Sequence, residues 1–151
     1  MNNNRTSGIL LHPTSLPGKY GIGTLGKQAV LFIDWLAEGN QQLWQILPLG
    51  PTGYGDSPYA SFSTFAGNPL LIDLEILVSD GVLTDQDITP PDYIKPAGPV
   101  DYGSVHWWKM PLLYKAAENF LAAGGNSDFS EFCRDNQWWL DDYALFMSIK
   151  T

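Results

Sequence analysis

The sequence predicts an α/β fold that begins with two parallel strands joined by a helix. Two short apolar runs, "SGILLH" at residues 7–12 and "QLWQILPL" at residues 42–49, are bounded by turn residues, which is typical of buried strands. A segment with helical periodicity separates them. A strand, a helix and a strand within about 45 residues predict a βαβ unit with parallel strands.

The helix between the strands is predicted from its apolar spacing and its end signals. Thr24 precedes the periodic segment and is the expected N-cap, and Gly39 with Asn40 is the expected stop. Asn40 tolerates the left-handed backbone conformation that such a stop uses. The apolar positions that share one helix face are Leu25, Ala29, Phe32, Ile33 and Leu36.

The second half of the chain is predicted to be irregular at first and helical afterwards. A short apolar segment and a turn, "NPLLIDLEILVSDGVLT", precede residues 85–100, which are too rich in proline for regular structure. A helix is expected from Ser104 to Gly124 and Gly125, with Pro111 near its first turn or at a kink. Ser127 is expected to cap a further helical stretch. A last amphipathic run, expected to stop at Thr151 without a cap, places on one face Trp139, Leu140, Tyr143, Ala144 and Met147.

The predicted sheet is too small to close. Two or three strands leave open edges, whereas a closed parallel barrel needs eight βα units in roughly 250 residues. We therefore expect the 151 residues to be an incomplete chain.

Composition excludes several classes of function. The net charge of -8, with only eight Lys and Arg in no cluster, argues against nucleic acid as a partner. Cys133 can form no internal disulfide, and with His12 and His106 it has no zinc spacing, so no metal is expected. The polar N-terminus lacks the apolar segment of a secretion signal, and no window suits a membrane span. A cytoplasmic protein without a membrane partner is expected.

Three glycines imitate a nucleotide-binding motif. Gly21, Gly23 and Gly26 fit the GxGxxG pattern between a strand and a helix. The first glycine lies about nine residues beyond the strand end, and the second strand ends without an acidic residue for a ribose hydroxyl. A nucleotide-dependent oxidoreductase is therefore disfavoured, and no cofactor is expected.

Several other conspicuous residues favour structural roles. His12 has no catalytic partner in the sequence and is interpreted as a hydrogen-bonded structural group. Asp73 in "LIDLE" is expected to fix a loop by hydrogen bonding, and Asp141 and Asp142 to form a solvated helix face. Four tryptophans in apolar patterns are expected in the core: Trp44, Trp107, Trp138 and Trp139.

The most unusual segment is "GYGDSPY" at residues 53–59, which follows the second predicted strand. Its glycines let the backbone approach a ligand closely, and Pro58 fixes a turn. Ser57 offers a hydroxyl to a sugar, and Tyr59 offers a ring face and a phenol. For Asp56, capping of nearby backbone N–H groups is favoured over a chemical role. Six tryptophans and seven tyrosines in the chain also suit a sugar-binding cleft.

Four strings in the same order resemble one known family. "GILLHPTSLPGKYGIGTLG", "LWQILPLGPTGYGDSPYASFSTFAGNPLLIDL", "VDYG" and "WWLDDYALFMSIK" are similar to the N-terminal part of amylomaltases, the 4-alpha-glucanotransferase family. The resemblance runs over nearly the whole chain. It implies the N-terminal part of a (β/α)8 TIM barrel of the alpha-amylase clan. Residues 1–75 would hold the first two βα units, and residues 76–151 part of an inserted, mostly helical and irregular subdomain.

The resemblance also implies a reaction and its residues. Family members transfer alpha-1,4-glucan segments between maltodextrins by a retaining double displacement, and their catalytic carboxylates would lie beyond residue 151. No catalytic residue is therefore expected in this chain. Ser57, Tyr59 and Asp56 would bind substrate at the reacting sugar, and Tyr54 and Tyr102 would form a second glucan site. For Tyr54 and Tyr102, packing within a loop is an equally favoured interpretation.

Two departures from the family pattern and one alternative remain. Ala60 replaces a glutamine that usually follows the tyrosine of the loop, which removes an amide near the cleft. "EGNQ" at residues 38–41 replaces the usual Glu-Ala-Gly-Gln. The alternative function is a stand-alone maltodextrin-binding module, without catalysis, that uses Tyr54, Tyr59 and Tyr102.

Overall fold

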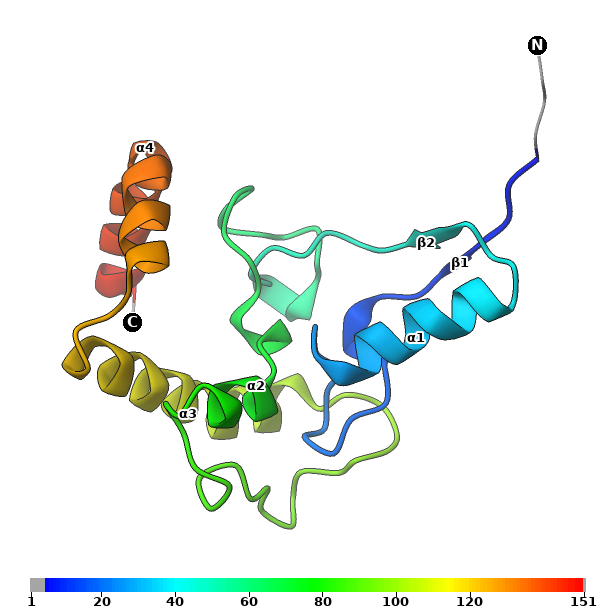
Figure 1. Ribbon diagram of the computed structural model, residues 1–151, viewed down its shortest axis with the longest axis horizontal. Coiled ribbons are helices and arrows are strands. Elements are labelled where there is room, and N and C mark those ends of the chain that lie inside the picture. Colours follow the sequence, from blue (N-terminus) through cyan, green and yellow to red (C-terminus); the bar gives the residue numbers. More distant parts are fainter. Residues whose placement is uncertain (1–4, 151) are drawn as a thin grey trace.

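Two parallel strands and the helix between them form one end of the molecule (Figure 1). The computed structural model describes residues 5–150, so the predicted uncapped end at Thr151 lies outside the described residues. Strand β1 spans Gly8–Leu10, helix α1 Lys27–Glu38 and strand β2 Leu43–Gln45. The strands pair in parallel with Ile9 opposite Trp44, which confirms the predicted βαβ unit.

Both strands are shorter than predicted. The ladder extends by one hydrogen bond at each end, from Gln42 N to Ser7 O and from Leu11 N to Gln45 O. It ends there because Pro13 begins a short 3-10 helix, η1 (Pro13–Ser15), directly after His12. Within residues 5–150, the apolar residues that follow β2 belong to no strand.

Helix α1 begins two residues later than predicted. Gly26 is its N-cap and makes no side-chain capping bond, so Thr24 is not the cap. Thr24 is buried and donates its hydroxyl to the Asp73 carboxylate at 2.5 Å. At the other end Asn40 has the expected left-handed conformation, with φ of 53°.

Only part of the predicted apolar face of α1 is covered. Ala29 and Leu36 are buried, and the Phe32 ring packs edge-on against Trp44 at 5.0 Å between ring centroids. Leu25 and Ile33 from the same predicted face are about half exposed, at 49% and 51%. The two strands are too narrow to cover the whole helix.

A short helix, α2 (Leu74–Ser79), follows Asp73 where only an apolar segment and a turn were predicted. The Asp73 carboxylate caps it by accepting hydrogen bonds from Glu75 N at 2.8 Å and Ile76 N at 3.3 Å. Asp73 therefore fixes the local chain by hydrogen bonding, as predicted, and it also holds Thr24. The 3-10 helix η3 (Pro69–Leu71) precedes α2.

The C-terminal third consists of two long helices, α3 (Tyr102–Ala122) and α4 (Ser127–Lys150). Asp101 caps α3 by accepting a hydrogen bond from Ser104 N at 3.1 Å, so Ser104 lies inside the helix rather than at its start. Pro111 lies in the helix interior. The predicted stop holds, with left-handed conformations at Gly124 and Gly125.

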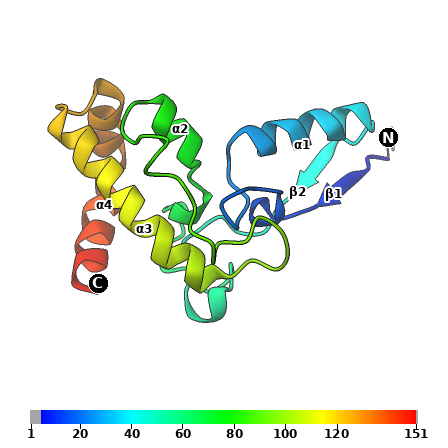
Figure 2. The same ribbon diagram turned by 90° about the horizontal axis from the view of Figure 1, so that it is seen from below.

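Helix α4 is one continuous helix where two stretches were predicted. Asn126, rather than Ser127, caps it, because the Asn126 side chain accepts a hydrogen bond from Phe129 N at 2.8 Å. Figures 1 and 2 both place α4 at the end of the molecule away from the strands. None of its described residues is buried.

The core lies between the two ends and joins residues from both halves of the sequence. One cluster of buried side chains contains Tyr20, Leu74, Leu83, Ile88 and Ala116, and the other contains Ile22, Leu70, Ile94 and Val105. Trp108 packs against both clusters. Each cluster combines side chains from before and after residue 75. The division into barrel units before residue 75 and a subdomain after it therefore remains a prediction. Residues 85–100 hold no helix or strand.

The prediction that four tryptophans lie in the core is wrong, because none of them is buried. Trp44 and Trp139 are half-buried, and Trp44 donates its indole N–H to Leu11 O at 2.7 Å. Trp107 and Trp138 are 81% and 67% exposed. The periodicity of α3 and α4 marks apolar positions correctly, but it does not indicate which face the rest of the fold covers.

The isolated chain is expected to self-associate. Leu10 and Leu43 on the strand pair are 58% and 56% exposed, and Trp35 on α1 is 57% exposed. Open strand edges beside exposed apolar side chains favour association. We expect residues 1–151 to run as oligomers or aggregates in sedimentation velocity. A monomer with a sharp, reversible two-state melt would contradict this expectation.

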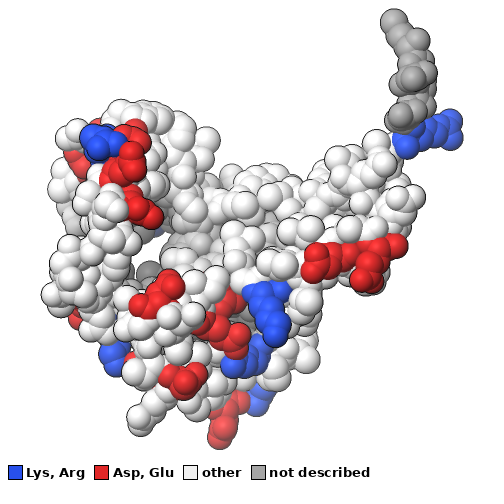
Figure 3. All heavy atoms as spheres, viewed as in Figure 1, with Lys and Arg blue, Asp and Glu red and all other residues white. Residues whose placement is uncertain are grey.

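Charge and hydropathy add two observations. In the part of the chain that the structure describes, no helix is long and apolar enough to cross a membrane. On the face shown in Figure 3, most Lys and Arg side chains lie near Asp or Glu side chains, and they form no large basic patch. The absence of a nucleic-acid partner remains a prediction.

Candidate functional site

The candidate site lies where both strands end. Because β1 and β2 are parallel, their carboxyl ends lie at one edge, and η1 and the segment of residues 47–68 both begin there (Figure 1). The second segment is closed at its base, since Asn68 N donates to Leu49 O at 2.8 Å. In βα folds the loops after the strand ends form the ligand-binding face.

His12 is held by a hydrogen-bond network in which its tautomer can be assigned. Its Nδ1 accepts from Thr14 N at 3.3 Å and lies 2.9 Å from Thr14 Oγ1. Nδ1 is therefore unprotonated, and Nε2–H donates to Pro48 O at 3.3 Å. Tyr102 donates its phenol to Thr14 Oγ1 at 3.3 Å. His12 is thus a structural group, as predicted, and it ties both strand-end loops to the first residue of α3.

A cavity of about 170 Å³ opens beside this network. It is lined by three groups of residues: His12, Thr14 and Ser15 after β1; Leu47, Thr52, Asp56, Pro58 and Asn68 after β2; and Tyr102 of α3. The cavity is small, and polar side chains contribute to its lining. Carboxylate, hydroxyl and imidazole groups of this kind suit the hydroxyls of a sugar.

Asp56 does not have the local capping role that was favoured for it. It lies in the 3-10 helix η2 (Tyr54–Asp56) with a left-handed φ of 54°, after Gly55 at 68°. Within residues 5–150 its carboxylate accepts no hydrogen bond, and it lines the cavity. The local bond comes instead from Ser57, whose Oγ accepts from Tyr59 N at 3.3 Å. The physical reason is the left-handed backbone, which puts Asp56 outside the turn that Ser57 and Ala60 close.

The three tyrosines differ in how far they are exposed. Tyr54 is 97% exposed and Tyr59 73% exposed, and neither phenol has a hydrogen bond within residues 5–150. Tyr102 is half-buried, packs against the cluster around Ile22 and lines the cavity, whereas Tyr54 lies outside it. The structure therefore brings Tyr102 together with Asp56 and leaves Tyr54 and Tyr59 as exposed rings on the same loop.

Sequence reasoning missed Lys109, which lies beneath the base of this loop. Its side chain is fully buried, with 0% exposure, and its Nζ donates to Leu70 O in η3 at 2.7 Å. Burial lowers the pKa of Lys109 to about 8, although the nearby negative charge of Asp73 opposes this shift. The signal was present in the spacing, because Lys109 lies four residues after buried Val105 on the covered stripe of α3.

The three glycines that imitated a nucleotide motif serve close packing. A Cβ at Gly23 would overlap Pro13 O, and a Cβ at Gly26 would overlap the Asp73 carboxylate. Gly21 has a left-handed φ of 75°. Their absent side chains are explained by contacts within the chain.

Comparisons with known proteins show which family the chain belongs to. The sequence profile described as 4-alpha-glucanotransferase matches residues 11–151. The chain belongs to the 4-alpha-glucanotransferase family. It is 50% identical over 146 residues to the 4-alpha-glucanotransferase of Streptococcus pneumoniae TIGR4, and 50% identical over 149 residues to that of Thermus thermophilus. Each alignment covers 97% of this chain and 29% of the relative.

A solved structure of this family has the same fold. The amylomaltase from Streptococcus agalactiae, in complex with acarbose, superposes with a TM-score of 0.87 at 43% identity. The match covers 97% of this chain and 30% of that amylomaltase. The chain therefore has the fold of part of an amylomaltase, and it spans less than a third of the length of the relatives it matches.

Proposed function

We propose that this chain is the glucan-binding N-terminal segment of a 4-alpha-glucanotransferase. The whole protein would transfer alpha-1,4-glucan segments between maltodextrins by a retaining double displacement. The observation that carries the proposal is the loop of residues 53–59 at the strand ends, in a chain about half identical to named 4-alpha-glucanotransferases. The barrel and the inserted subdomain implied by the resemblance belong to this proposal.

The loop residues would each make a different contact with the reacting sugar. Tyr59 presents an exposed ring whose face suits the apolar C–H face of a pyranose. The free Asp56 carboxylate in the cavity would accept hydrogen bonds from sugar hydroxyls. Ser57 would donate its hydroxyl to the sugar, because its oxygen already accepts from Tyr59 N. The amylomaltase from Streptococcus agalactiae was solved in complex with acarbose. Acarbose is a maltooligosaccharide analogue, so this complex supports the proposed substrate class.

A second glucan site would use Tyr54 and Tyr102. Tyr54 supports it, because a ring that is 97% exposed is available for stacking. For Tyr102 the exposed part of its ring would contribute, since its phenol is engaged with Thr14. The catalytic carboxylates would come from outside these 151 residues. A cytoplasmic location remains part of the proposal.

The test compares the chain with the full-length protein. We expect purified residues 1–151 to leave maltotriose unchanged, because retaining chemistry needs two carboxyl groups about 5 Å apart across the scissile bond. The full-length protein should release glucose and form longer dextrins, measured by chromatography. Turnover that follows the isolated chain through several preparations would contradict the proposal. Maltodextrin binding by a monomeric, inactive chain would support the stand-alone binding module instead.

A further inference from the structure

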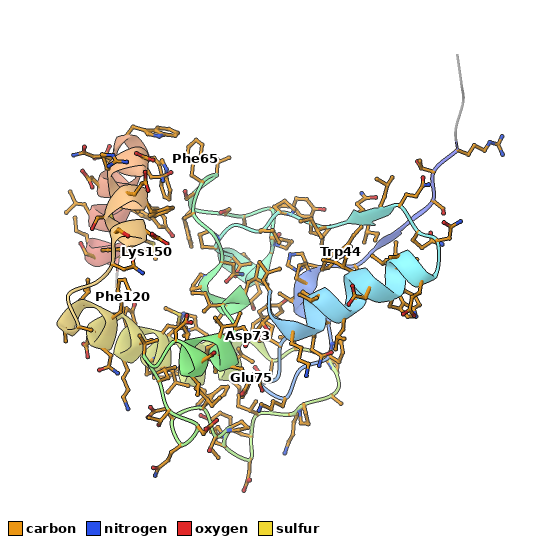
Figure 4. The ribbon with its side chains drawn as sticks, viewed as in Figure 1. Trp44, Phe65, Asp73, Glu75, Phe120 and Lys150 are labelled. Carbon is orange, nitrogen blue, oxygen red and sulfur yellow. The ribbon has the colours of Figure 1, made fainter. Side chains whose placement is uncertain are left out.

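Residues 60–66, the segment that directly follows the glucan-binding loop, contact helix α4. Phe65 packs edge-on against Trp138, with 4.6 Å between ring centroids and 75° between ring planes. Its ring also lies 5.8 Å from that of Trp139. Figure 4 shows Phe65 directed toward α4.

A second contact holds the same segment three residues earlier. The Phe62 ring lies 6.4 Å from the ring of Phe146, and the Lys150 ammonium lies 3.1 Å from the Phe62 centroid. An ammonium this close to a ring face is a cation–π contact. Trp138, Phe146 and Lys150 lie along α4, so two aromatic side chains of the segment are fixed along one helix.

Short contacts order the chain between Ser57 and Ala66, beginning with the hydrogen bond from Ala60 N to Ser57 O at 3.1 Å. Ser63 Oγ accepts from Phe65 N at 3.1 Å and from Ala66 N at 3.0 Å, which makes residues 63–66 a defined turn. Ser61 donates to Ser63 O at 2.6 Å. At Gly53 an added Cβ would overlap Ala60 O, so the two ends of the loop that holds Ser57 and Tyr59 are in direct contact.

We propose that α4 positions Ser57 and Tyr59 for glucan binding through Phe62 and Phe65. Phe65 and Trp138 are the principal positioning residues, and neither needs to touch the substrate. Tyr59 is 73% exposed and has no hydrogen bond from its phenol within residues 5–150, so its placement depends on the backbone around it. A loop that holds its binding conformation for only a fraction of the time binds more weakly by that fraction. This inference rests on the proposed function of the loop.

The test is a double-mutant cycle in the full-length protein with maltotriose. We expect Phe65→Ala and Trp138→Ala each to raise KM about threefold to tenfold, the range for one aromatic pair, with a smaller change in kcat. Because both changes remove the same contact, the double variant should cost no more than the larger single change. Trp138→Phe keeps a ring at this position and should restore most of the affinity.

Amide hydrogen exchange gives a second measurement that needs no activity. Exchange at residues 57–66 should be faster in Phe65→Ala and Trp138→Ala. The matched control is Gln137→Ala, an exposed neighbour of Trp138 on α4, which should change neither exchange nor KM. Additive losses in the cycle, or unchanged exchange at residues 57–66, would overturn the proposal. If the wild-type protein does not disproportionate maltotriose, the proposed function fails, and the exchange measurement still decides whether α4 orders the loop.

Discussion

Tyr59→Ala in the full-length protein is expected to lower the rate on maltotriose by roughly thirtyfold to a thousandfold. The substitution removes an exposed ring that we propose to stack on the reacting sugar, together with a hydrogen bond that its phenol would make to that sugar. By ordinary magnitudes these contribute about 2–4 kcal/mol of transition-state stabilisation. The loss should appear in kcat as well as in KM, because the contacts act on the distorted sugar.

Tyr54→Ala is the matched control for this variant. Both tyrosines lie on the same loop and both are exposed. Each substitution therefore removes one exposed aromatic ring from this loop. Tyr54→Ala should mainly alter how the rate depends on glucan length. Melting temperatures must be measured for both variants. A normally folded Tyr59→Ala that keeps kcat within a factor of about two would show that the loop does not bind the reacting sugar.

Lys109→Ala is expected to destabilise the protein by about 3–5 kcal/mol. The change opens a cavity beneath the loop base and leaves the buried Leu70 carbonyl without its donor. Lys109→Met keeps most of the buried volume and removes the buried charge, so it should cost less, about 1–2 kcal/mol. The measurement is the free energy of unfolding by denaturant. Equal losses in the two variants would show that the buried volume has little importance.

The pH dependence of stability should reveal the buried ammonium. An unfolded lysine keeps its proton up to a pKa near 10.5, whereas folded Lys109 has a pKa of about 8. Between these values the unfolded chain binds more protons, so this group makes the free energy of unfolding rise with pH, by up to about 3 kcal/mol. Below about pH 8 its contribution is flat.

The difference between wild type and Lys109→Met isolates this contribution from the other groups that titrate at alkaline pH. The wild type should gain stability relative to Lys109→Met from about pH 8 to about pH 10.5. A constant difference over this interval would mean that the ammonium is not desolvated in solution.

The sequence allowed the order and type of the main elements to be predicted, because their signals are local. The βα unit, the left-handed Asn40 and the stop at Gly124 and Gly125 depend on periodicity and on backbone preference. The start of α1 could not be predicted, because Thr24 is a good local cap that bonds instead to Asp73, 49 residues later. A local rule cannot anticipate a distant partner.

For the candidate site, too, features with local signals could be predicted and features that depend on the folded structure could not. The position of the loop after a strand was predictable from the order of segments, and its sugar chemistry from residue types. The roles of Asp56 and Ser57 were not, because they depend on the left-handed φ of Asp56. Trp138 was expected in the core because helical spacing marks an apolar stripe without saying what covers it. Its 67% exposure and its contact with Phe65 depend on how α4 is placed.

The Asp73 carboxylate, labelled in Figure 4, also constrains how this sequence can change during evolution. It serves the Thr24 hydroxyl and the first turn of α2 at the same time, and the bare Cα of Gly26 packs directly against it. A side chain at position 26 would require a smaller residue at position 73, and Asp73→Ser would still cap α2 while leaving that space. Positions 24, 26 and 73 should therefore covary in related sequences, with an alanine at position 26 accompanied by a serine or a glycine at position 73.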